Sequence, residues 1–212
     1  MIMTHIVKPE VPSKDIKQGL NQVYHRKCAY CEQYQESMHV EHYRPIAGYN
    51  WLADSWDNLF LSCAICNYRK GNKFPIQNAD CKVHYSASFN IRKHRCGKLY
   101  DRIEKPFIIN PEREPYLERH FDFKSNGEII GKTEQGKVTI NVCGLNREDL
   151  IVARLELLNE LKAAVKKRKL ESGATGVKNV ISDFLDTIRK PEKYGFLAFR
   201  KYILQNELAK IY

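Results

Sequence analysis

Three stretches within residues 28–74 decide the fold of this chain: CAYCE (28–32), MHVEHYRPIAG (38–48) and WDNLFLSCAICNYRKGNKF (56–74). They contain two Cys-x-x-Cys pairs, Cys28 with Cys31 and Cys63 with Cys66. Two such pairs are typical of a zinc site, because tetrahedral Zn2+ accepts a shell made of four thiolates. A closed shell leaves no coordination position for a substrate. We therefore expect this zinc ion to be structural and the chemistry to belong to the residues that it holds in place.

A second set of polar residues lies between and just after the cysteine pairs. Glu41 and Asn67 offer a carboxylate oxygen and an amide oxygen, which are hard ligands that suit Mg2+ or Mn2+. His42 follows Glu41 directly in a predicted strand, so their side chains should point to opposite sides of it. That geometry is reasonable if one residue binds a metal ion and the other acts on a nearby water. Asn58 is expected to hydrogen-bond the backbone across the intervening loop and hold the histidine strand in position.

Short helices and strands are predicted around the cysteine pairs. Apolar residues at helical spacing indicate a helix over about 14–26, with Ser13 as its N-cap and Asp15 in its first turn. Two short strands are predicted on either side of the loop between the pairs, over residues 38–43 and 58–62. A further helix is expected to begin at Cys66 and to be cut short by Gly71.

The stretch from 75 to 105 is polar and basic, and we expect a loop there. It contains Cys81-x-x-His84 and His94-x-Cys96, which offer the donor atoms for a second metal site. Their order and spacing match no zinc site that we can defend, so a basic loop is the preferred interpretation.

The second half of the chain reads as a β-hairpin followed by helices. Asn126-Gly127 lies between aromatic and aliphatic runs, and this dipeptide is typical of a hairpin turn. Asn146 is expected to cap a helix that ends in the basic cluster 166–169. Glycines at 173 and 176 then break the chain, and two more helices are predicted over about 177–189 and 195–210. We divide the chain into residues 1–110 and 111–212, with one continuous domain as the alternative.

The composition indicates a basic, folded protein. Its formal charge is +10, from 35 Lys+Arg against 25 Asp+Glu, and 43% of its residues are hydrophobic. This charge favours nucleic acid as a partner over a membrane, because no basic helix has a continuous apolar face. Reduced cysteines at zinc spacing suit the cytosol, and residues 1–15 lack the apolar run of a signal peptide. We therefore expect a cytoplasmic protein without a membrane span.

The chain resembles an HNH nuclease in four motifs: Cys28-x-x-Cys31, Glu41-His42-Tyr43-Arg44-Pro45, Asn58-Leu59 and Cys63-x-x-Cys66-Asn67-x-x-Lys70-Gly71-Asn72. It is similar to one branch in particular, the nuclease subunits of Septu anti-phage defence systems, also found beside some retrons. That similarity rests on the segments CAYCE, VEHYRP, WDNL, KGNKFP, IINP and GLNR. The resemblance implies an α+β fold with a zinc-stabilised ββα-metal core, a small β-hairpin and a mostly helical C-terminal region.

The resemblance also implies roles for individual residues. His42 occupies the position of the general base, and Asn58 fills the middle, structural position of the motif. Glu41 and Asn67 stand where the family places ligands of a catalytic Mg2+ or Mn2+ ion, with Asn67 in place of the final histidine. Arg44, Arg69 and Lys70 lie close in sequence to these groups and are expected to bind phosphates, with a plain surface charge as the alternative for each.

The partners follow from the same resemblance. We expect double-stranded DNA as the substrate and an ATPase subunit as a second protein. One active site per chain cuts one strand, so a homodimer or a larger assembly is suggested for cutting both. Two alternatives remain open at this point: an HNH nuclease that cleaves RNA such as tRNA, and a zinc-ribbon module that binds nucleic acid without catalysis.

Overall fold

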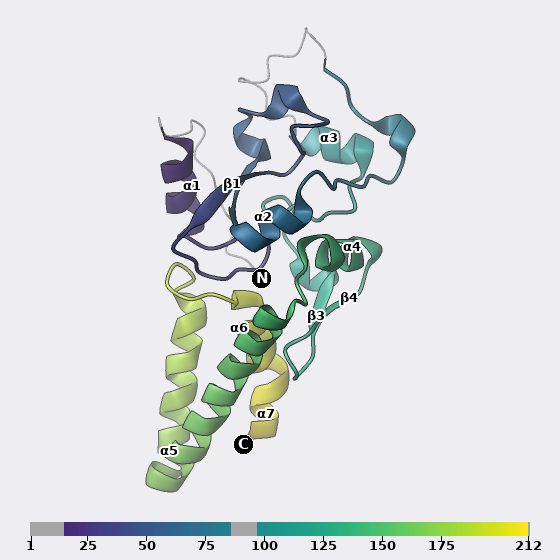
Figure 1. Cartoon of the computed structure of the whole chain (residues 1–212). Helices are drawn as coiled ribbons and strands as arrows, with labels where there is room; N and C mark the ends of the chain where they lie inside the picture. The colour runs from purple at the N-terminus through teal and green to yellow at the C-terminus, as the bar shows by residue number, and fades with distance from the viewer. Residues whose placement is uncertain (1–14, 86–96, 212) are drawn as a thin grey trace.

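The computed structural model describes residues 15–85 and 97–211, and its centre is a two-stranded antiparallel sheet. Strand β1 (Met38–His42) pairs with β2 (Leu59–Cys63), so that Glu41 lies opposite Phe60 and His42 opposite Leu59. Helix α2 (Ala64–Lys70) follows β2 directly (Figure 1). Both α2 and helix α1 (Ile16–Tyr24) pack on the two strands. The expected ββα core and the α+β fold class are confirmed.

Local signals explain where the two core helices begin and end. The N-cap of α1 is Asp15, whose carboxylate accepts a hydrogen bond from the backbone N–H of Gln18 at 3.0 Å. The expected cap, Ser13, lies outside the described residues, and Asp15, which we expect in the first turn, is the N-cap instead. Helix α2 ends before Gly71, which has a positive φ of 47° that glycine adopts without strain.

The segment between α2 and the hairpin is more ordered than the sequence indicates. It contains the 3-10 turn η3 (Ala79–Cys81) and the helix α3 (Gly97–Glu104), whereas the turns η1 (Asn50–Leu52) and η2 (Trp56–Asn58) lie in the loop between β1 and β2. The expectation of a loop is therefore wrong for the last part of 75–105. Tyr100 and Glu104 of α3 are buried. Glu104 can be buried because it forms an ion pair with Arg44, and nothing in the polar sequence of this stretch indicates that contact. Two of the four residues of the second metal site considered above, His94 and Cys96, lie outside the described residues.

The predicted hairpin is confirmed. Strands β3 (Phe121–Phe123) and β4 (Ile129–Gly131) pair in antiparallel fashion after the turn η4 (Leu117–Arg119). A helix that the sequence analysis missed, α4 (Glu134–Cys143), follows β4 and packs on it and on α2. Asn146 does not cap the next helix, because its side-chain amide bonds the backbone N–H and C=O of Ile129 instead, at 2.7 and 2.8 Å.

The C-terminal third forms a helical arm, by which we mean α5, α6 and α7. Helix α5 (Glu148–Arg189) is broken at Gly173, where φ is 58° and ψ is −142°, and its two legs fold back beside each other (Figure 1). Gly176, the other predicted break, stays within the helix. Helix α6 (Leu197–Tyr202), a π turn (Ile203–Glu207) and α7 (Leu208–Ile211) pack against the legs.

Two hydrophobic clusters correspond to these parts. One surrounds β1 and β2 and also takes in Cys143, Leu145 and Leu150 from beyond residue 110. The other lies within the arm, between the legs of α5 and α6. The division of the chain at residue 110 stays a prediction. Among the residues that the structure describes, no helix is long and apolar enough to cross a bilayer.

Candidate functional site

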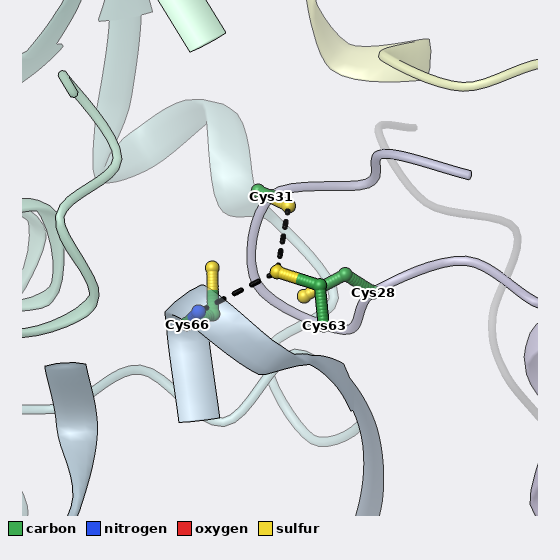
Figure 2. Close-up of side chains that lie close together, drawn as sticks. All are labelled: Cys28, Cys31, Cys63 and Cys66. Carbon is green, nitrogen blue, oxygen red and sulfur yellow. Dashed lines mark hydrogen bonds between the residues drawn. The ribbon is translucent and has the colours of Figure 1, made fainter. Parts of the chain in front are cut away.

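The four cysteines of the two pairs meet in one buried cluster. All their sulfur atoms lie within 4.8 Å of one another (Figure 2). Cys28 and Cys31 come from the turn after α1, whereas Cys63 ends β2 and Cys66 lies in the first turn of α2. Cys63 also caps α2, because its sulfur accepts a hydrogen bond from the backbone N–H of Cys66 at 3.4 Å. Four convergent thiols with no other donor among them suit a structural zinc ion.

A cation that the sequence does not indicate lies against this cluster. Arg147 is the N-cap residue of α5, and its guanidinium donates to the sulfurs of three of the four cysteines: Cys66 at 3.3 Å, Cys31 at 3.9 Å and Cys63 at 3.9 Å. Its side chain is only 6% exposed. The GLNR segment that contains Arg147 carried part of the resemblance, but nothing local to it indicates a contact with cysteines more than 80 residues away.

The His42 imidazole is half-buried on β1 and held by a single backbone group. Its Nε2 lies 3.0 Å from the carbonyl oxygen of Ala53, in the loop between the strands. A carbonyl only accepts hydrogen bonds, so Nε2 carries the proton and the neutral ring keeps a lone pair on Nδ1. Burial lowers the pKa of His42 and thus favours this neutral form. The ring can therefore accept a proton at Nδ1.

Asn58 joins the loop to the end of the histidine strand. Its side-chain oxygen accepts from the backbone N–H of Arg44 at 2.8 Å, and its amide nitrogen donates to the Arg44 carbonyl at 3.0 Å and to the Leu52 carbonyl at 3.3 Å. Leu52 directly precedes Ala53, the residue that holds His42. Because Asn58 is buried, the three bonds are shielded from competing water, and they fix the His42 strand relative to the loop.

Glu41 points away from His42 and into the protein. Its Oε1 forms an ion pair with Nζ of Lys70 at 2.5 Å and accepts from the Tyr30 hydroxyl at 3.3 Å. Lys70 also donates to the His42 carbonyl at 2.7 Å. The Glu41 side chain is 4% exposed and that of Lys70 is 0% exposed, so each neutralises the other in the interior. Burial raises the pKa of Glu41, and the Lys70 ammonium opposes that rise.

Asn67 lies one residue after a cysteine of the cluster and reaches β1 from α2. Its Nδ2 donates to the Val40 carbonyl at 3.4 Å, which leaves Oδ1 as an acceptor. The donors proposed for a catalytic ion are therefore near the same strand, but Glu41 is already paired. Among the described residues, the four cysteines are the only group of three or more His, Cys, Asp or Glu that converges on one point.

The three basic residues expected to bind phosphate are placed very differently. Arg44 is 1% exposed and pairs with Asp101 and Glu104 of α3, both at 2.8 Å. Lys70 is equally enclosed, so the expectation of phosphate contact is corrected for both: their charges are satisfied inside the protein. Arg69 is exposed on α2 and lines an open depression of about 700 Å3 with Ala64, Ile65, Tyr68 and Lys73.

Comparisons with known proteins agree with this geometry. A model of the HNH endonuclease family matches residues 28–73. The Septu protein PtuA of Bacillus mycoides (strain KBAB4) is 29% identical over 205 residues, which cover 89% of this chain and 26% of that protein. The Septu protein PtuB of the same strain is 29% identical over 188 residues, covering 78% of this chain and 57% of PtuB.

A third relative, the Septu protein PtuB of Bacillus thuringiensis, is 28% identical over 173 residues, covering 76% of this chain and 56% of that PtuB. This chain thus spans about a quarter of the first relative's length and little more than half of the other two. The matched region 28–73 holds both the cysteine cluster and His42, Asn58 and Asn67. Residues 28–73 therefore match the HNH endonuclease family, and the chain is similar to Septu proteins over most of its length.

Proposed function

We propose that this chain is a metal-dependent endonuclease that hydrolyses phosphodiester bonds in double-stranded DNA. One observation carries the proposal: His42 is held by a backbone carbonyl in the tautomer that leaves Nδ1 able to accept a proton, within the stretch matched by the HNH endonuclease family. A zinc-ribbon module that only binds nucleic acid would have no need of a histidine poised in this way.

His42 acts as the general base in the proposed reaction. Its Nδ1 takes a proton from a water molecule as the water oxygen bonds to phosphorus. The bond from phosphorus to the 3′ oxygen breaks, and the leaving 3′ oxygen takes up a proton from solvent water. The hydrogen bond from Nε2 to Ala53 stabilises the imidazolium that forms, because the ring remains a donor there. Asn58 keeps strand and loop in register during this step, and we assign it a positioning role.

We further propose Zn2+ for the four cysteines and a catalytic Mg2+ or Mn2+ ion near Glu41 and Asn67. The cysteine donors fit zinc as they stand. The second set fits a hard divalent ion only once Lys70 leaves the Glu41 carboxylate, since one buried carboxylate oxygen already binds the ammonium.

The substrate surface in this proposal is the exposed side of α2. Arg69 and Lys73 supply positive charge beside the Tyr68 ring, which is 88% exposed. Cations position a phosphate backbone, and an aromatic face can contact sugar or an unstacked base. The same helix carries Asn67, so nucleic acid on this surface would lie next to the catalytic residues. The overall charge of +10 supports a polyanionic substrate.

Assembly and cellular role follow from the similarity to Septu proteins. We propose an anti-phage role in the cytoplasm, with an ATPase subunit as the partner and two chains, or successive nicks, for cutting both strands. The helical arm is our candidate for the partner contact, because it projects from the nuclease core (Figure 1).

The deciding experiment compares wild type with His42→Ala on plasmid, linear DNA and tRNA, each with Mg2+, Mn2+ or EDTA, with and without the ATPase partner. Wild type should cut DNA only with metal, and His42→Ala should lose about 10²–10⁴-fold in rate. The matched control is His39→Ala, which removes an exposed histidine from the same strand and should keep full activity.

Four outcomes would contradict parts of the proposal. Cutting in EDTA, or undiminished cutting by His42→Ala, would rule out the mechanism. Preferential cutting of tRNA would replace the DNA substrate by RNA. Binding without cutting under every condition, including those with the partner, would favour the non-catalytic zinc module.

A further inference from the structure

The Arg147 side chain is positioned by the cysteine sulfurs, by the Gly144 carbonyl and by the Asp149 carboxylate. Its Nη1 and Nη2 donate to three sulfurs, and Nη1 also donates to the Gly144 carbonyl at 3.3 Å. Its Nε pairs with Asp149, in the first turn of α5, at 2.9 Å. A planar guanidinium held in this manner presents its N–H groups to the sulfurs in one fixed orientation.

The charge of a loaded site explains why a cation belongs there. Four thiolates around Zn2+ leave two negative charges on a cluster whose cysteines are all buried. In such an environment an uncompensated charge is costly, and hydrogen bonds from a charged donor are stronger than neutral ones. The shortest contact goes to Cys66, the residue directly before Asn67.

We propose that Arg147 is the outer partner of the zinc site: it stabilises the thiolates through N–H···S bonds and ties the start of the helical arm to helix α2. The inference rests on the zinc site in the proposed function, but not on nuclease activity. Arg147 touches no reacting group, so it is a positioning residue. Asp149, which touches no cysteine, orients the guanidinium from its far side.

The first test measures zinc affinity by competition with a chelator. Arg147→Leu should lose about 10–100-fold in affinity, which is typical when a partner of metal ligands is removed. Arg147→Lys keeps the charge with fewer donors and should fall between this variant and wild type, as should Asp149→Asn. The matched control is Arg168→Leu, on the same helix. Arg168 forms an ion pair with Glu171 and contacts none of the four cysteines among the described residues, so this variant should bind zinc like wild type.

A spectroscopic readout separates this role from a merely structural one. In Co2+-loaded protein, N–H···S bonds lower the energy of the sulfur lone pairs, so their loss should move the sulfur-to-cobalt charge-transfer bands to longer wavelength. The tetrahedral d–d bands should stay, which shows that all four cysteines still bind. Arg147→Lys and Asp149→Asn make the same measurement possible even if Arg147→Leu does not fold.

The results distinguish this inference from the proposed function. Folded Arg147 variants with wild-type zinc affinity and unshifted charge-transfer bands would overturn it. A wild-type protein that binds neither zinc nor cobalt would overturn the zinc site itself. Shifted bands in a protein that cuts no substrate would support the inference while counting against the nuclease.

Discussion

The core around β1, β2 and α2 and the helical arm bury different kinds of side chain. In the core, charged residues are fully enclosed as pairs, such as Glu41 with Lys70 and Arg44 with Glu104. The arm is held mainly by aliphatic and aromatic residues, such as Leu158, Val165, Val177, Phe184 and Phe199. A buried pair is sensitive to the loss of either member, whereas an apolar cluster loses stability in proportion to the area removed.

Because of this difference, we expect the core and the arm to unfold separately. The core combines a four-cysteine cluster and ion pairs on a sheet of only two short strands, which is marginal by itself in water. In the described part of the arm no group of three or more His, Cys, Asp or Glu converges on one point, and apolar residues join its helices. Substitutions at Cys66, Lys70 and Gly173 test this distinction.

Loss of the zinc site should have the largest effect, and it should be confined to the core. Cys66→Ser removes one of four ligands, and structural zinc is worth about 10–16 kcal/mol of folding free energy in small zinc peptides. We expect hydrogen exchange to show lost protection in β1, β2 and α2, with protection retained in the legs of α5. Cys81→Ser, outside the cluster, is the control and should behave like wild type. Equal loss in both parts would mean that core and arm fold as one unit.

A smaller effect is expected from the buried ion pair. Lys70→Met leaves the Glu41 carboxylate unpaired in the interior and should cost about 3–5 kcal/mol in the free energy of unfolding. The double variant Glu41→Gln, Lys70→Met should recover much of that loss, because no uncompensated charge remains. Urea denaturation of wild type, both single variants and the double variant gives the coupling energy.

Lys73→Met is the matched control, since it removes an exposed lysine near the end of the same helix. It should change stability by no more than about 0.5 kcal/mol. Strictly additive effects of the Glu41 and Lys70 changes would show that the pair is not coupled.

Features coded by neighbouring residues were predictable from the sequence. Cysteine spacing indicated the cluster, and Asn126-Gly127 indicated the hairpin, because both signals act over a few residues. Helix α4 was missed although Thr133 caps it and Gly144 ends it, since its β-branched residues favour a strand in isolation. Packing on α2 and β4 decides in favour of the helix.

The site shows the same limit. The motif brings His42, Asn58 and Asn67 to one strand pair and its helix, and short-range geometry suffices for that. The burial of Arg44 could not be predicted, because its partners Asp101 and Glu104 follow 57 and 60 residues later. Arg147 is further still from the cysteines it contacts. Charged residues that the sequence suggests are at the surface are thus paired inside the protein, with partners that are distant in the sequence.

Gly173 offers the mildest test, and it lies in the arm. Its φ of 58° with ψ of −142° is a conformation that side chains strongly disfavour, yet a Cβ there would meet nothing within 4 Å. Gly173→Ala should therefore cost about 1–3 kcal/mol from backbone strain alone, measured by hydrogen exchange in α5. The core should keep its zinc affinity, since no contact with the cysteines changes.

Gly176→Ala gives the contrasting case within the same turn region. Gly176 has no positive φ, but an added Cβ would lie 2.7 Å from the Arg168 carbonyl oxygen on the facing leg. Its cost should come from pushing the legs apart rather than from strain. If Gly173→Ala proved neutral and sedimentation showed a dimer, the legs would have joined into one continuous helix that pairs between two chains. The break in α5 would then depend on Gly173, and the apolar contacts between the legs would not be enough to keep the legs folded back.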